Sequence, residues 1–405
     1  MARRFEAFAI PMLLPSSASP WLVAALWISV LGLGYIFVGY PLLVWIAARL
    51  RPRRPGPAVD VSNLTATVLI AAHNETDTLA RKLRQLLDQP RVTAIRVGVD
   101  GAAPEVIAAC ESVGDDRVGV IPFPDRCGKP AILSQLIPDV ATPVTVMADA
   151  RQQIAADAID ALIERLADPE VGVVSGELVF RSSDAATAAS EGVGAYWTYE
   201  KLIRKSEAAF RGVPGATGAL YAIRTDLAHP IPANTLLDDV VIPMQAVESG
   251  ARCVFEPRAI VYDAPTTEPR KEAIRKRRTI AGAAQLAVAQ PRWLLPWRNP
   301  IWWEFVSHKL ARLLAPLLMV VALAANIAIV CLDNPTGNVF TVYDVLFVGQ
   351  LLFYAAAFFG AVAQRAGLRL PLVSVPLMFV TLNGTTALAL WDALRGRFTA
   401  TWKRS

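Results

Sequence analysis

Asp149 ends an apolar, β-branched run, Val144–Ala148, and polar residues follow it. This pattern predicts a buried parallel strand with a turn after Asp149. Open α/β sheets bind their ligands beyond the carboxyl ends of such strands. A carboxylate at that point, close to anionic phosphates, needs a divalent cation or a sugar hydroxyl as its partner. The alternative is a helix N-cap, because aspartate also begins helices.

Two further predicted strands also end in acidic residues. Asn74 and Glu75 follow a predicted strand at 65–72, and Asp100 ends another at 95–100. A carboxylate at a strand end can accept hydrogen bonds from a base or a ribose, which favours a nucleotide as the ligand. For Asn74 and Glu75 the alternative is capping of the helix that follows.

A pair of carboxylates, Asp238 and Asp239, precedes a predicted helix whose first turn we expect to contain Pro243. The positive end of the helix dipole would keep Asp239 ionised, so that it could act as a general base. Ordinary capping by the pair is the alternative.

Cations lie among these carboxylates. Lys129 opens a predicted helix after Gly128, and both its ammonium and the helix N-terminus attract anions. Arg151 either contacts a phosphate or faces solvent. Arg224 ends a glycine-containing strand and is either a site residue or an ordinary surface cation. For the cation run 275–278, the alternative to a role in the site is attraction to anionic lipid.

The elements that must position these residues alternate between strand and helix across 65–265. Strands are expected at 65–72, 95–100, 118–121, 143–148, 171–180, 218–223 and 252–255. Helices are expected from Asp77, to about Cys110, and over 128–137, 155–166 and 188–210. This βαβ alternation predicts a mostly parallel, doubly wound sheet of the Rossmann type.

Long apolar runs flank this region and raise the hydrophobic content of the 405 residues to 54%. After an N-terminal segment (1–20), the uncharged run 21–48 is long enough to span a bilayer. A basic, proline-rich linker (49–64) follows, and the positive-inside rule places it and the domain after it in the cytoplasm.

The C-terminal part predicts interfacial helices over 266–309, rich in cations and tryptophan, and then a transmembrane region over 310–394. Two spans are expected at 310–332 and 340–362, joined by a loop without Lys or Arg that should face outward. A third run, from Pro371, is interrupted by Pro376. Either it spans, which places the basic tail (395–405) outside, or it is re-entrant.

Charge and cysteine content exclude other classes of protein. The net charge of +5 comes from cations beside the apolar runs, which is typical of an inner-membrane protein and not of a nucleic-acid binder. The four cysteines form no CxxC pair and predict free thiols in a reducing compartment. The three histidines have no ligand spacing, which argues against zinc.

The order of these motifs over about residues 60–310 resembles the membrane-integrated family-2 glycosyltransferases, the cellulose, hyaluronan and poly-N-acetylglucosamine synthase group. The resemblance implies a GT-A catalytic domain on the cytoplasmic face of the inner (plasma) membrane, which transfers a sugar from a nucleotide donor with inversion. It implies nucleotide-sugar binding by Asn74, Glu75, Asp100, Lys129, Asp149 and Arg278.

The same resemblance assigns roles within the site. Asp149 would hold the donor diphosphate through Mg or Mn, and Asp239 would be the base that deprotonates the acceptor hydroxyl. The secondary or acceptor-side residues would be Asp238, Arg151, Arg224 and Arg275.

The chain departs from the family pattern at several positions. Arg151 replaces the second carboxylate of Asp-x-Asp, and Ala102 replaces a serine after Asp100. Arg275 replaces a glutamine, and Thr279 replaces a tryptophan that stacks on the acceptor sugar in the processive synthases.

We therefore expect a membrane glycosyltransferase that uses a nucleotide sugar, most simply a UDP-sugar, in contact with membrane lipids. The expected acceptor is a lipid-linked glycan or a growing extracellular polysaccharide, and a homo-oligomer or an export partner is possible. One alternative is a catalytically silent subunit that keeps the fold for polysaccharide binding or export. Another is a membrane nucleotidyltransferase, which would release pyrophosphate. The sugar, the linkage and the number of transfers stay open.

Overall fold

The computed structural model describes residues 19–180, 188–263, 269–333, 341–368 and 370–397. The chain divides into two compact units, each described here by itself. A helical unit contains residues 1–40, 187–195 and 314–387, and a sheet unit contains 41–186, 196–313 and 388–405.

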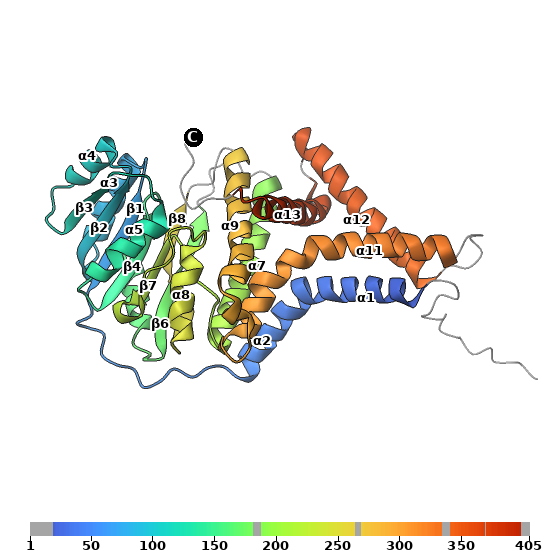
Figure 1. Cartoon of the computed structure of the whole chain (residues 1–405), viewed down its shortest axis with the longest axis horizontal. Coiled ribbons are helices and arrows are strands. Elements are labelled where there is room, and N and C mark those ends of the chain that lie inside the picture. The colour runs from blue at the N-terminus through green and yellow to red at the C-terminus, as the bar shows by residue number, and fades with distance from the viewer. Residues whose placement is uncertain (1–18, 181–187, 264–268, 334–340, 369, 398–405) are drawn as a thin grey trace, which may run out of the picture. The chain divides into compact units, whose positions relative to one another are not determined.

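The sheet unit is built on one eight-stranded sheet (Figure 1). Its strands, in spatial order, are β3 (Val118–Phe123), β2 (Val92–Asp100), β1 (Ala66–Ala72), β4 (Val144–Asp149), β7 (Leu220–Arg224), β6 (Val171–Phe180), β8 (Arg252–Asp263) and β5 (Gln153–Ile154). The first four are parallel, as are β6 and β8, whereas β7 runs antiparallel to both of its neighbours and β5 runs antiparallel to β8. The predicted Rossmann-like, mostly parallel sheet is confirmed, with an antiparallel insertion at β7.

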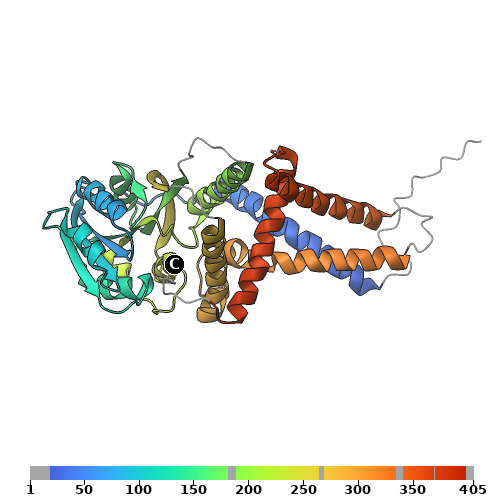
Figure 2. The same ribbon diagram turned by 90° about the horizontal axis from the view of Figure 1, so that it is seen from above.

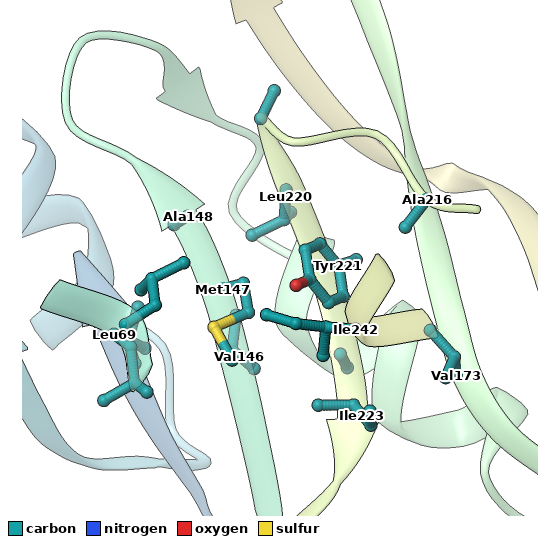
Figure 3. Close-up of a cluster of buried hydrophobic side chains, with 14 of the residues drawn as sticks. Leu69, Val146, Met147, Ala148, Val173, Ala216, Leu220, Tyr221, Ile223 and Ile242 are labelled. Atoms are coloured by element: carbon teal, nitrogen blue, oxygen red, sulfur yellow. The ribbon is translucent and has the colours of Figure 1, made fainter. Parts of the chain in front are cut away.

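Helices lie close to the predicted positions. In this unit they include α3 (Asp77–Leu87), α4 (Pro104–Glu111), α5 (Lys129–Leu136), α6 (Ala158–Arg165), α7 (Ala188–Phe210), α8 (Asp238–Glu248) and α9 (Pro269–Ala289). All residues of β1 are buried, and all except Thr67 are apolar, as expected for a central strand of a parallel sheet. Figure 3 shows part of the core, with Met147 of β4, Tyr221 of β7 and Ile242 of α8.

Strand register brings the predicted site residues to one edge of the sheet. Ala71 pairs with Asp149, and Ala72 pairs with Val99, so the residues that follow β1 lie beside Asp100 and Asp149. Because β7 is antiparallel, its first residue, Leu220, pairs with Ala148. The loop before β7 therefore reaches the same edge.

The predicted linker is fastened to the sheet unit. Arg53 forms an ion pair of 2.8 Å with Glu170, and its backbone N–H donates to the Ala209 carbonyl at 2.8 Å. Val59 N–H donates to the Ala167 carbonyl at 2.8 Å. The prolines of the linker restrict its backbone, and these contacts hold it against the sheet unit.

Four helices in the described part of the chain are long and apolar enough to span a membrane: Pro20–Leu50, Trp302–Leu332, Val342–Arg365 and Leu372–Leu394. The predicted spans are therefore found as helices. The second begins earlier than expected, inside the stretch predicted to be interfacial. The third C-terminal run, α13 (Pro371–Leu394), is one helix that continues through Pro376. Most of the loop predicted to face outward and the end of the basic tail lie outside the described residues.

The long helix Pro20–Leu50 comprises α1 (Pro20–Gly34), a π-helical turn (Tyr35–Gly39) and α2 (Tyr40–Leu50). Single π-helical turns of this kind occur inside otherwise continuous α-helices. The other long helices are α11 (Ala311–Asp333), preceded by the short α10 (Trp302–Glu304), and α12 (Val342–Arg365).

Within the helical unit, α1 and α11 lie side by side (Figures 1 and 2). Their contact buries Leu26, Ala325 and Ile329, and Tyr343 of α12 packs against the same cluster. An added Cβ at Gly32 would lie 3.0 Å from Leu318 Cδ1, so glycine allows the close approach. Small residues at helix contacts are typical of membrane proteins.

Arg224 is not where the predicted role requires it. It pairs with Val144, at the opposite edge of the sheet from Asp149. Its guanidinium donates from Nε to the Val171 carbonyl at 3.0 Å and from Nη2 to the Leu166 carbonyl at 2.7 Å. Arg224 therefore ties the C-terminal end of α6 to β6, and the prediction of an acceptor-side residue was wrong because β7 runs antiparallel.

Replacing Arg224 by methionine should lower the free energy of unfolding by about 2 kcal/mol, because two carbonyls lose a charged donor. The measurement is the thermal unfolding midpoint of the purified protein. Arg81→Met, at an exposed position of α3, is the control and should leave the midpoint unchanged. An unchanged midpoint in Arg224→Met would show that these hydrogen bonds do not stabilise the fold.

Candidate active site

Lys129 joins two of the predicted carboxylates. Its Nζ lies 2.8 Å from Asp149 Oδ1 and 3.0 Å from Asp238 Oδ2. Burial alone would lower the pKa of Lys129, but the charges of Asp149 and Asp238 hold it well above the usual range. Lys129 is therefore a permanent cation at the centre of the site.

Asp149 is not a helix cap. A turn and β5 follow it, and α6 begins only at Ala158, with Asp157 as the preceding residue. The side chain of Asp149 is 35% exposed at the end of β4. It can therefore contact a ligand while it keeps the ion pair with Lys129.

Asp100 holds the loop that carries Lys129. Its Oδ1 accepts hydrogen bonds from Cys127 N at 2.7 Å and from Gly128 N at 3.2 Å, and the side chain is fully buried. Gly128 has φ +82°, which favours glycine. The structure thus shows Asp100 fixing the entrance of α5, a role that the sequence motif did not indicate.

Glu75 shapes the turn after β1. Its Oε2 accepts from His73 N at 2.9 Å and from Asn74 N at 3.2 Å. His73 Nδ1 lies 2.9 Å from the Asp100 carbonyl oxygen. The residue before α3 is Thr76, so the capping alternative for Asn74 and Glu75 was wrong. The Asn74 side chain is exposed at the ligand edge.

Asp239 is clamped by the loop that precedes β7. Gly218 N–H donates to Asp239 Oδ2 at 3.1 Å, and Ala216 N–H donates to the Asp239 carbonyl at 2.7 Å. Pro243 explains the second bond. It lies in the second turn of α8, not in the first as predicted, and a proline there cannot donate to the carbonyl four residues earlier. Ala216 supplies the missing donor.

Neither member of the acidic pair caps α8. The N-cap is Leu237, with no side-chain capping bond, and Asp238 and Asp239 are the first two helical residues. Burial and then the charge of Asp238 raise the pKa of Asp239 to about 6. The predicted effect of the helix dipole is therefore outweighed, although Asp239 is still largely ionised at neutral pH.

Two residues that the sequence did not single out support this loop. Ser175 Oγ accepts from Thr217 N at 2.9 Å and from Arg204 Nη2 at 2.7 Å. The guanidinium of the half-buried Arg204 lies over the ring of Phe255, 4.9 Å from its centroid. The pairing of β6 with β7 creates this arrangement, and nothing local in the sequence signals it.

The Arg151 side chain is 41% exposed and forms an ion pair, so it faces solvent and is also accessible to a phosphate. Its Nη2 is 2.6 Å from Asp263 Oδ2, and Gln152 Nε2 donates to the same oxygen at 3.3 Å. Arg275 Nη1 lies 3.9 Å from that oxygen. Asp263 was missed because β8 was expected to end at 255, whereas it extends to Asp263.

Helix α9 fastens the loop that leads to the acidic pair. Gln285 Oε1 accepts from Leu236 N at 2.9 Å, and its Nε2 donates to the Asn234 carbonyl at 2.9 Å. An added Cβ at Gly282 would lie 2.5 Å from Leu237 Cγ. Arg278 is half-buried on the same helix.

The predicted residues thus fall into groups. Lys129, Asp149 and Asp238 are in direct contact, with Asp239 next in the chain. Arg151 and Arg275 meet at Asp263. The fold brings Asn74, Glu75 and Asp100 to the same sheet edge, and Arg224 lies at the other edge.

The residues do not fit a divalent ion held by the protein alone. Among the described residues, no group of three or more His, Cys, Asp or Glu side chains is placed to hold a metal. Asp149 Oδ1 is taken by an ammonium, and the expected second carboxylate is an arginine paired with Asp263. Hard cations prefer several oxygen ligands, which this arrangement lacks.

Replacing Gln285 by alanine should loosen the loop before Asp238, because both of its hydrogen bonds to the loop backbone are lost. Amide hydrogen exchange at Leu236 should become about tenfold faster, as expected for roughly 1.4 kcal/mol of lost local stability. Gln290→Ala, at the end of the same helix, is the matched control. Equal exchange rates at Leu236 in both variants would contradict the clamp.

Comparisons with known proteins agree with this architecture. Residues 64–282 match the family model described as "Glycosyltransferase like family 2". Many solved structures are similar. One is the mannosyltransferase PcManGT from Pyrobaculum calidifontis, described in complex with GDP-Man and Mn2+, at 20% identity and a TM-score of 0.67 over 92% of this chain and 100% of that one. No curated protein sequence gave a significant match. Since the family model matches more than half of the 405 residues, the chain belongs to glycosyltransferase family 2 and is a glycosyltransferase.

Proposed function

We propose that the chain transfers a sugar from a nucleotide sugar to an acceptor hydroxyl with inversion at the anomeric carbon. The observation that carries the proposal is the clamped carboxylate of Asp239, whose Oδ2 accepts from Gly218 N at 3.1 Å, beside the Lys129–Asp149 ion pair of 2.8 Å. This arrangement provides a base and an anion-binding cation at the carboxyl ends of parallel strands.

In this proposal Asp239 takes the proton of the acceptor hydroxyl as its oxygen attacks the anomeric carbon. The bond from that carbon to the leaving diphosphate breaks, and the sugar inverts. A base with a pKa near 6 suits the task, because it is ionised at neutral pH and basic enough to accept the proton. Lys129 and Arg278 would stabilise the charge on the departing diphosphate.

The donor and its cofactor are predictions within this proposal. A UDP-sugar remains our expectation, and GDP-mannose is the second candidate because PcManGT is described with it. Mg or Mn also remains a prediction, supported by the Mn2+ of the PcManGT complex. In this chain Asp149 would be one of few protein ligands, with diphosphate oxygens supplying others.

The apolar helices support a class of acceptor within this proposal. Four described helices are apolar and long enough to span a bilayer, which supports a lipid-linked glycan or a growing polysaccharide as the acceptor. The arginines of the 49–64 linker favour a cytoplasmic catalytic domain at the inner membrane. Thr279 offers no ring for stacking on a sugar, and its hydroxyl donates to the Arg275 carbonyl at 3.1 Å. This supports a single transfer over processive synthesis.

The proposal is tested by nucleotide release. Membranes or purified protein receive UDP-sugars and GDP-mannose with lipid extract, with and without Mn, and UDP or GDP is measured. Asp239→Asn should lower the rate by at least about 100-fold, because the base is lost. Asp226→Asn, at an exposed position, is the control.

If Asp239→Asn releases nucleotide at the wild-type rate, the assignment of the base is wrong. If the wild-type protein releases nucleotide from no donor, the catalytically silent subunit is favoured instead. Pyrophosphate release from a nucleoside triphosphate would favour the nucleotidyltransferase.

At low pH, the rate of sugar transfer should decrease because Asp239 becomes protonated. This decrease is the acidic limb of the pH–rate profile. The pKa of Asp239 is raised to about 6, so the base is protonated below that pH and the rate should fall about tenfold per pH unit as pH decreases. Asp238→Asn removes a neighbouring negative charge that raises this pKa. The limb should therefore move to lower pH in that variant, and an unchanged or higher limb would contradict the assignment.

A further inference from the structure

A buried lysine lies behind the donor edge of the sheet. Lys82 of α3 is fully buried, and its Nζ has no hydrogen-bond partner among the described residues. Lysine is almost never fully buried unless it is paired. Removing an ammonium from water without a partner is unfavourable, so the position needs a physical explanation.

The packing of α3 places this lysine near the site. Gln85 Oε1 accepts from Ile154 N at 3.2 Å, and Gln89 Nε2 donates to the Ala155 carbonyl at 3.3 Å, so α3 lies along β5 and the residues after it. Lys82 is one turn before Gln85 on the same face of the helix. The helix packs against β5, which begins two residues after Arg151.

Three charged groups act on Lys82. Burial lowers its pKa to about 8, while the charges of Asp149 and Asp263 raise it and that of Lys129 lowers it further. The two carboxylates are those already paired with Lys129 and with Arg151. Asp149 shares Lys129 with Asp238, so Lys82 is an additional cation in a region where one ammonium serves two carboxylates.

This charge arrangement differs from a metal-centred one. A divalent ion would need carboxylates, yet the chain has Arg151 at the expected second carboxylate and an ammonium on Asp149. A diphosphate is a concentrated anion that cations of the protein can also neutralise. A buried charge acts on such an anion through a low-dielectric medium, even without direct contact.

We propose that Lys82, together with Lys129 and the exposed Arg151, supplies positive charge to the donor diphosphate subsite, so that a nucleoside diphosphate binds even when no divalent ion is present. Lys82 is a positioning residue in this scheme: it holds a positive potential behind Asp149 and Asp263 and does not touch the ligand. The inference rests on the proposed nucleotide-sugar function and goes beyond it by naming what holds the diphosphate.

The test uses the full-length protein in detergent and measures binding of UDP and GDP, with uridine and guanosine as the uncharged counterparts, in EDTA and in Mn. The wild-type protein should bind its preferred diphosphate in EDTA. Lys82→Met should weaken that binding by about tenfold or more and leave binding of the matching nucleoside unchanged. Arg81→Met removes an exposed cation one residue away and should have no effect.

Methionine fits an apolar site of similar length, so Lys82→Met should keep or raise the thermal midpoint. If Lys82 had only a structural role, Lys82→Met would change the affinities for the nucleoside diphosphate and for the nucleoside by the same factor. Diphosphate affinity in Lys82→Met within twofold of wild type would overturn the role of Lys82. Loss of wild-type binding in EDTA, with recovery in Mn, would overturn the metal-free subsite. A wild-type protein that binds no nucleoside diphosphate in either condition would overturn the proposed function itself.

Discussion

The ion pairs of Lys129 hold the site together. One ammonium joins the end of β4, through Asp149, to the start of α8, through Asp238. These elements are far apart in the sequence, and each carries negative charge that would repel the other without a cation between them. Asp100 fixes the ammonium in turn by holding the Gly128 loop. The positions of a strand end and of a helix start therefore depend on one charge.

The second constraint is the clamp on Asp239. A helix normally satisfies its own carbonyls, but Pro243 leaves the Asp239 carbonyl without its helical donor. The Ala216 N–H donates to that carbonyl instead. This bond brings the loop before β7 close enough for the Gly218 N–H to donate to the Asp239 carboxylate. Gly215 adopts φ +110° in that loop. A helix defect and a permissive backbone thus fix the direction of one side chain.

Local pattern was sufficient for the strands and for the strand-end carboxylates, because an apolar run that stops at an aspartate is visible in the sequence. Strand direction was not visible. The antiparallel course of β7 moved Arg224 to the far edge, and the length of β8 brought Asp263 beside Arg151. The other buried residues of α3 are leucine or alanine, so the sequence pattern does not indicate that Lys82 is buried with them. The structure shows that Lys82 is buried and that its Nζ has no hydrogen-bond partner among the described residues.

In the proposed diphosphate subsite, Lys82 would also link folding to ligand binding. Its pKa is lowered from 10.5 to about 8, so its ammonium is less favourable in the folded chain than in water. Asp149 and Asp263 offset part of that cost, although Asp149 also pairs with Lys129 and Asp263 with Arg151. A bound diphosphate would offset more, and a ligand that binds only the folded state stabilises it by mass action. In the proposed subsite, an apolar residue in place of Lys82 would stabilise the ligand-free fold and weaken binding of the anion.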